Sequence, residues 1–166
     1  MRKSLVGATV SADLYQRRLG VTHFILGLPL SFLGFMLPVY GDALGGSPVQ
    51  IGLLYTAFSA MTIVARPVVG ALSDRLGRRP FLIAGLAAYA ASLALLAAAR
   101  GLGAALVARA LQGVASSLFW LVSNASVADV TGPEDRALRF GALTAAEVKG
   151  EMFGSFLGFA VLFSTM

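Results

Sequence analysis

Hydrophobic residues in this chain gather into five long runs separated by short polar linkers. Each run approaches or exceeds the roughly 20 apolar residues that a helix needs to cross a bilayer, and the linkers are rich in residues typical of turns. The pattern predicts five transmembrane helices, at approximately residues 19–40, 49–72, 81–99, 102–128 and 140–166. The first run is too long for a signal peptide and no small-residue cleavage site follows it, so we expect a retained helix. Residues 1–18 form a polar, basic segment before it.

The composition excludes a soluble globular domain and a disordered chain. Hydrophobic residues make up 57% of the 166 residues and charged residues 13%, against about 45–50% and 25% in soluble domains. Disorder would require low hydrophobicity and a high net charge. The absence of cysteine leaves no disulfide, thiolate metal site or cysteine nucleophile. The net charge of +5 comes from basic residues that form no dense run beside aromatic residues, so we expect no nucleic-acid partner.

The basic residues lie mainly on one side of the predicted membrane. If every run crosses, residues 1–18, 73–80 and 129–140 lie on the same side and carry nine Lys and Arg residues, whereas the opposite linkers carry only Arg100. An excess of Lys and Arg marks the cytoplasmic side. We therefore expect a multi-pass integral protein in contact with the lipid bilayer, with a cytoplasmic N-terminus, in a bacterial-type inner (plasma) membrane.

The linker between the second and third runs, GALSDRLGRRP from Gly70 to Pro80, is the most informative segment of the chain. Gly70 allows another helix to approach closely, and Gly77 permits a tight reversal of the chain. Asp74 lies at the membrane boundary among three arginines, which suits a charge-paired latch. These arginines are Arg75, Arg78 and Arg79. A merely basic cytoplasmic turn would explain the arginines but not the spacing of Gly, Asp and Gly.

This linker closely resembles the signature loop of the major facilitator superfamily, G-x-L-x-D-R-x-G-R-R between helices 2 and 3. Every fixed position of that pattern matches, namely Gly70, Leu72, Asp74, Arg75, Gly77, Arg78 and Arg79. The sequence RALQG at residues 109–113 is similar to the R-x-x-Q-G element of the family's helix 4. The stretch at residues 132–141 looks like the family's usual loop before helix 5.

The resemblance implies a secondary transporter of two six-helix bundles, which works by alternating access around a site near the bilayer midplane. It also implies that Asp74 and the neighbouring arginines form a cytoplasmic interdomain latch that favours the outward-open state. The matching helix 4 residue, Arg109, would take part in proton coupling. By this likeness the chain is the N-terminal part of the first bundle, and we expect it to need the missing C-terminal helical half as a partner.

Several charged residues fall within the predicted helices. A charge near the bilayer centre costs about 2.5–3.5 kcal/mol on the lenient insertion scale, so such residues usually face the bundle interior and have partners. Those that we interpret as functional intramembrane charges are Arg66, Arg109, Glu147 and Glu151. At ~1.5 Å per residue, Arg109 and Glu151 lie at similar depths, and we predict that they pair. Arg66 either supports a kink at Pro67 or pairs with an acid.

Helical spacing groups further residues on shared faces. Gly150, Gly154 and Gly158 form overlapping small-xxx-small steps, which predict close packing against another helix. Residues predicted to face a substrate are Gln112, Ser116, Phe119, Trp120 and Phe32. For the serines, hydrogen bonds to neighbouring helices are favoured over substrate contact. For His23, helix packing is favoured over a role that uses its titration near neutral pH.

The sequence thus favours proton-coupled efflux of a small molecule, with no cofactor and no metal. Helix 5 of the family's proton-driven exporters usually carries a Gly-Pro pair, which is absent here, so a uniporter or symporter is an alternative. A truncated membrane fragment without transport activity is another. An enzyme is not expected, because the chain has one histidine, no cysteine and no acidic cluster with metal-ligand spacing.

Overall fold

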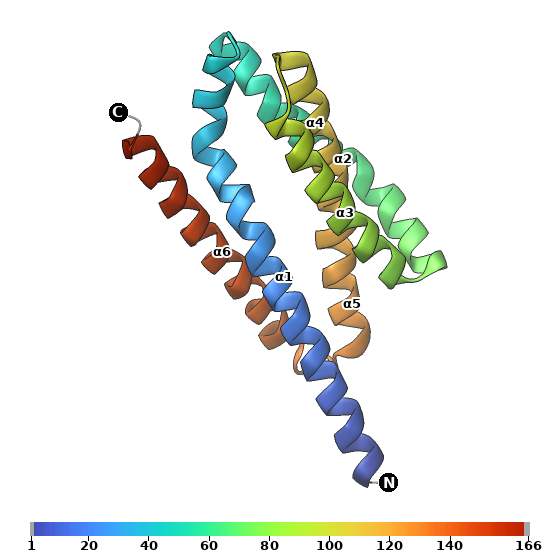
Figure 1. The fold of residues 1–166 in the computed structure, drawn as a ribbon. Helices are drawn as coiled ribbons and strands as arrows, with labels where there is room; N and C mark the ends of the chain where they lie inside the picture. Colours follow the sequence, from blue (N-terminus) through green and yellow to red (C-terminus); the bar gives the residue numbers. More distant parts are fainter. Residues whose placement is uncertain (1, 165–166) are drawn as a thin grey trace. The chain divides into compact units, whose positions relative to one another are not determined.

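The computed structural model describes residues 2–164, with side chains from residue 14 onward, and every element within that range is helical. The elements, shown in Figure 1, are α1 (Arg2–Ala43), α2 (Pro48–Leu76), α3 (Arg78–Ala97), α4 (Leu102–Ser116), the π-helical turn η1 (Ser117–Leu121), α5 (Val122–Val130) and α6 (Arg136–Ser164). The predicted all-α architecture is confirmed. Residues 165–166 of the predicted fifth helix lie outside the described residues.

Among the described residues, four helical segments are long and apolar enough to cross a membrane. They are Leu14–Ala43, Pro48–Leu76, Arg78–Ala97 and Leu102–Val130. The fifth predicted crossing corresponds to α6, which has 29 residues but carries Glu147, Lys149 and Glu151 near its middle. By length and composition, therefore, four of the five predicted crossings are supported. The α6 helix is long enough to cross, but it has more charged residues near its middle than those four segments allow.

Several helices extend beyond the apolar runs. The first helix begins at Arg2 rather than near Leu19, and α6 begins at Arg136 rather than near Phe140. Hydropathy marks where a helix can lie in lipid, whereas backbone hydrogen bonding continues until a cap or a helix-breaking residue ends it. No proline precedes Leu19, so nothing local ends the helix at the edge of the apolar run.

Specific hydrogen bonds and one glycine define the turns between helices. Ser47 and Gln50 form a capping box at the start of α2, in which the Ser47 amide donates to Gln50 Oε1 at 2.9 Å and the Gln50 amide donates to Ser47 Oγ at 3.4 Å. Gly77 makes the reversal between α2 and α3 at a φ of 89°. The hydroxyl of Tyr40 donates to the carbonyls of Leu96 and Ala99, at 2.6 and 3.0 Å, where α3 ends.

The chain divides into two compact units, and the boundaries fall inside α1 and α5. Unit 1 comprises Met1–Met36 and Val127–Met166, and unit 2 comprises Leu37–Ser126. Within unit 2, α4 and η1 pack against both α2 and α3. Within unit 1, α1 lies along α6, as Figure 1 shows for the blue and red helices. Each unit therefore contains helices that are distant in sequence.

The helices α1 and α6 of unit 1 run parallel in a regular register. Three polar pairs join them at sequence separations of 123 or 124, namely Gln16–Arg139, His23–Glu147 and Ser31–Ser155. Successive pairs are seven or eight residues apart on each helix, which is about two helical turns. We call these three pairs the α1–α6 polar ladder.

Glycines allow the two helices of unit 1 to meet backbone to backbone. A Cβ on Gly150 would lie 2.1 Å from the carbonyl oxygen of Phe24, and one on Gly154 would lie 2.1 Å from that of Leu28. No side chain larger than hydrogen fits at these positions without a shift of the backbone. The close packing predicted from the glycine spacing is therefore confirmed, and its partner is α1.

The register of α1 against α6 can be tested with an engineered disulfide, because the chain contains no cysteine. A Cβ on Gly20 would lie 3.9 Å from the Cβ of Ala146, within the roughly 3.5–4.5 Å found in disulfides. We expect the variant with Gly20→Cys and Ala146→Cys to cross-link in membranes under mild oxidation, measured by loss of maleimide-reactive thiols. The control, Gly20→Cys with Ala145→Cys, turns the second thiol about 100° around the helix. Equal cross-linking of the two variants would contradict the register.

Candidate functional site

Arg109 is a buried cation held by α2 and α4 within unit 2. Its side chain is 4% exposed, its Nε donates to the carbonyl of Leu54 at 3.2 Å, and its terminal nitrogen donates to Gln112 Oε1. The guanidinium lies 4.6 Å from the ring centre of Phe58 and 5.9 Å from that of Tyr55, within the range of cation–π attraction. Arg109 makes no ion pair within unit 2, so hydrogen bonds and aromatic faces balance its charge there.

The position of Arg109 depends on a close contact between α2 and α4. A Cβ on Gly113 would lie 2.3 Å from the carbonyl oxygen of Phe58. Further along the contact, the Ser117 hydroxyl donates to the carbonyl of Thr62 at 2.7 Å. Because Arg109 precedes Gly113 by four residues, it lies on the same helix face. The spacing of RALQG thus brings the guanidinium against α2.

Gln112 completes this buried polar group. Its side chain is 1% exposed, and its amide oxygen accepts from Arg109. The amide nitrogen has no hydrogen-bond partner among the described residues. A buried donor without a partner costs about 1–3 kcal/mol. The Arg109–Gln112 pair therefore presents a buried cation and an unused donor, which together suit an oxygen-bearing, anionic group.

The π-helical turn η1 interrupts the helix that carries Arg109. There Gly85 of α3 comes so close that a Cβ would lie 2.8 Å from the Phe119 nitrogen. The Trp120 ring centre lies 5.3 Å from that of Phe119 and 5.6 Å from that of Tyr89. Hydropathy gave no signal for this turn, because a π-bulge changes hydrogen bonding without changing apolar periodicity over a few residues. Such turns occur frequently at functional sites.

The predicted substrate-facing residues do not gather on one surface within either unit. Gln112 and Phe119 are buried in unit 2, and Ser116 and Trp120 are half-buried there. Phe32 belongs to unit 1, where its ring lies 3.7 Å from the position of a Cβ on Gly158. The interhelical hydroxyl bonds of this region come from Ser117 and Thr62, neither of which was predicted from the sequence.

The loop at Gly70–Pro80 contains an ion pair of its own. The distance from Arg78 Nη1 to Asp74 Oδ1 is 2.5 Å, and the Asp74 side chain is 63% exposed. Arg78 also donates to Ser73 Oγ at 2.9 Å, and Ser73 Oγ donates to the carbonyl of Gly70 at 3.1 Å. An exposed pair of this spacing contributes only about 0.3–0.5 kcal/mol. The Asp74–Arg78 pair can therefore exchange partners at little cost.

The other charges of the loop and of α2 face outward. Arg75 and Arg79 are exposed, as is Arg66 in the turn before Pro67. Arg66 makes no ion pair within unit 2, and proline lies inside α2 at the next position. The sequence left two alternatives for Arg66, support of a kink at Pro67 or pairing with an acid. No acidic partner for Arg66 is present in its own unit.

His23 and Glu147 meet between α1 and α6 in unit 1. The distance from His23 Nδ1 to Glu147 Oε2 is 3.3 Å, with 1% of the histidine side chain and 22% of the glutamate side chain exposed. His23 is buried as a packing residue would be, but the sequence reading did not predict its acidic partner. Glu151, half-buried, follows Glu147 by one helical turn. Because Glu151 belongs to unit 1 and Arg109 to unit 2, their pairing stays a prediction.

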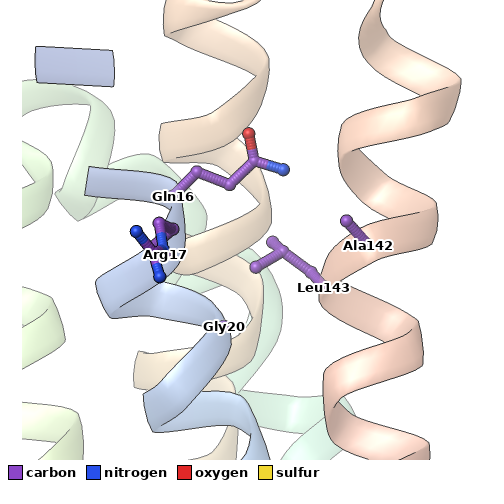
Figure 2. A pocket seen from close by; sticks show the side chains of 5 residues that line it. All are labelled: Gln16, Arg17, Gly20, Ala142 and Leu143. Carbon is purple, nitrogen blue, oxygen red and sulfur yellow. The ribbon is translucent and has the colours of Figure 1, made fainter. Parts of the chain in front are cut away.

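A cavity opens between α1 and α6 near the first pair of the polar ladder. It has a volume of about 380 Å³ and is lined by Gln16, Arg17, Gly20, Ala142 and Leu143. Figure 2 shows the Gln16 side chain of α1 and the Leu143 side chain of α6 extending into the space between the helices. Gln16 also accepts a hydrogen bond from Arg139. The cavity therefore lies at a polar end of the helix pair.

Comparison with known proteins shows which family this chain is similar to. The family model of the Major Facilitator Superfamily matches residues 19–165. The chain is 36% identical over 124 residues to the class C tetracycline resistance protein of Escherichia coli, covering 72% of this chain and 30% of that protein. It is 34% identical over 144 residues to the class G tetracycline resistance protein of Vibrio anguillarum, covering 83% and 36%.

A more distant relative is the quinolone resistance protein NorA of Staphylococcus aureus. It is 26% identical over 135 residues, which cover 81% of this chain and 35% of that protein. The chain thus spans about a third of the length of the curated relatives that it matches.

The backbone of Gly77 provides a test of the loop geometry. Its φ of 89° and ψ of 159° lie in a region that is essentially restricted to glycine. We expect Gly77→Ala to lower the free energy of unfolding by about 1–3 kcal/mol, measured by detergent titration in mixed micelles. The control is Gly52→Ala in α2, where nothing lies within 4 Å of the added Cβ. Equal destabilisation by both substitutions would count against a special role for the Gly77 backbone.

Proposed function

Because the chain belongs to the major facilitator superfamily, we propose that it is part of a proton-coupled transporter that exports a small molecule by alternating access. It is an integral membrane protein with several crossings, and its family is one of transporters rather than enzymes. The relatives are named as tetracycline and quinolone resistance proteins. A transporter that confers resistance must move the drug away from its target, which supports export.

The observation that carries this proposal is the buried cation of α4. Arg109 is held by a backbone carbonyl and by Gln112, and no carboxylate of its own unit forms an ion pair with it. A buried charge of this kind calls for an anionic partner. In the proposed mechanism Glu151 supplies the carboxylate. Protonation of that carboxylate removes its negative charge and releases the guanidinium, so proton binding and helix rearrangement are linked.

The Gly70–Pro80 loop would serve as the cytoplasmic latch. Its charges are mostly exposed, and the pair within it is weak enough to be replaced. An acid or base from the other half of the transporter would therefore compete for Asp74 or Arg78. Arg75 and Arg79 would add to this charge network when the two halves close on the cytoplasmic side.

A uniporter or symporter is the second candidate. The glycines of α6 serve a contact with α1, and α6 lacks the Gly-Pro pair that is usual in helix 5 of the family's exporters. Aromatic side chains near Arg109, such as Tyr55 and Phe58, suit a planar amphipathic substrate for either direction of transport. The direction is decided by measuring drug movement in vesicles of known orientation.

Substitution of Arg109 tests the buried cation. In inverted membrane vesicles that contain the complete reading frame, we expect Arg109→Lys to reduce tetracycline or quinolone transport at least about tenfold. Lysine carries the charge but cannot reproduce the two directed bonds of the guanidinium. Arg100→Lys, in the α3–α4 turn, is the matched control and is expected to transport normally. Full transport by Arg109→Lys, or transport that persists with a protonophore, would argue against the coupling proposed here.

Substitution of Glu151 tests proton coupling directly. A carboxamide cannot take up a proton, so Glu151→Gln is expected to flatten the dependence of transport on pH while binding of the drug is retained. The control is Glu134→Gln, an exposed acid in the turn before α6. Transport measured from acidic to alkaline pH decides the point. A profile for Glu151→Gln that matches the unsubstituted protein would remove Glu151 from the mechanism.

A further inference from the structure

The α1–α6 polar ladder has one pair in which both side chains bind protons. Gln16 with Arg139 and Ser31 with Ser155 keep their charge states over the physiological pH range. His23 and Glu147 form the pair between them and are 3.3 Å apart. Unlike the other two pairs, this one changes its net charge when a proton binds or leaves.

We propose that His23 and Glu147 together form a proton-binding site, which exchanges one proton through the cavity between α1 and α6. The inference rests on the proposed proton-coupled function for its biological purpose. It concerns different residues from Arg109 and Glu151, and proton binding at this pair can be measured without transport.

The balance of charge explains why the pair would hold a proton. With one proton, the pair is neutral overall, either as imidazolium with carboxylate or as imidazole with carboxylic acid. Loss of that proton leaves a carboxylate beside a neutral imidazole, a net charge of −1. His23 is 1% exposed and Glu147 22% exposed, so little water reaches the pair to stabilise that charge. The bound proton therefore favours the closed helix contact, and its release favours separation.

The cavity supplies a route for the proton. Gly20 lies three residues before His23, and Leu143 lies four residues before Glu147. Both helices thus bring the cavity wall within about one turn of the pair. A volume of about 380 Å³ is large enough to admit water. Figure 2 shows this wall from both helices.

The other charged side chains of unit 1 are less buried than His23 or lie away from the His23–Glu147 pair, so this pair is the buried proton site that we propose for the unit. On α6, Glu151 lies one turn beyond Glu147, whereas Lys149 is exposed. Toward the cavity, Arg139 bonds to Gln16, and Arg17 lies on the wall. The other ionisable side chains described in this unit are not buried, and they are Tyr15, Arg18, Asp129, Glu134, Asp135 and Arg136. Glu151 is the neighbour that most needs a control.

The single histidine of the chain makes the proposal measurable. Purified protein with isotope-labelled histidine is reconstituted in lipid, and infrared difference spectra are recorded through a pH titration. We expect one shared transition in which an imidazole band and a carboxylic acid band change together, because coupled groups titrate as a pair. In Glu147→Gln, the carboxylic acid band is lost and the imidazole transition moves by about one pH unit or more. In Glu151→Gln, the control, the shared transition persists.

His23→Gln provides the reciprocal test, in which the Glu147 carboxyl band is expected to change its transition. Folding of each variant is checked with the disulfide between Cys residues introduced at positions 20 and 146. If one variant fails to fold, the other decides. An imidazole transition that is the same with and without the Glu147 carboxylate would overturn the proposal. Coupled bands together with a failure of the complete reading frame to transport would instead overturn the proposed function and leave the proton site intact.

Discussion

Helix backbones in both units meet at glycines, where an added methyl group would lie between 2.1 and 2.8 Å from an atom of the neighbouring helix. In lipid, helices gain little from burying apolar surface against one another, so association depends on close packing and on hydrogen bonds. The glycines that provide this packing are Gly85, Gly113, Gly150 and Gly154. Each closes the distance between two helices enough for nearby polar side chains to reach across.

The polar sites follow from these contacts. In unit 2, the approach of Gly113 to α2 brings Arg109 to the carbonyl of Leu54. In unit 1, the approach of Gly150 to α1 lies next to the meeting of His23 with Glu147. The same geometry explains why buried charge is tolerated, because every close contact supplies carbonyls, amides or a counter-charge in place of water. Packing and chemistry are therefore properties of the same helix faces.

Much of the fold was predictable because its signals are local. Hydropathy indicated the helices, and the spacing of Gly150 and Gly154 indicated a packing face. Gly77 indicated a tight turn, because glycine adopts the backbone conformation that such a turn requires. Other features had no local signal. The extension of α1 to Arg2 depends on the absence of a helix breaker rather than on apolar residues. The π-helical turn at Ser117–Leu121 arises where α3 presses against the helix.

The sequence by itself determined that this is a helical membrane protein of a transporter family, with a charged loop at Gly70–Pro80 and a cation in helix 4. Those conclusions depend on composition and on residues close together in the chain. Only the tertiary structure decided that His23 faces Glu147 and that Gln112 keeps an unused amide donor beside Arg109. The partners in unit 1 are separated by more than a hundred residues, and their register is set by backbone contacts at glycines. No pattern within one helix encodes which turn of another helix it will meet.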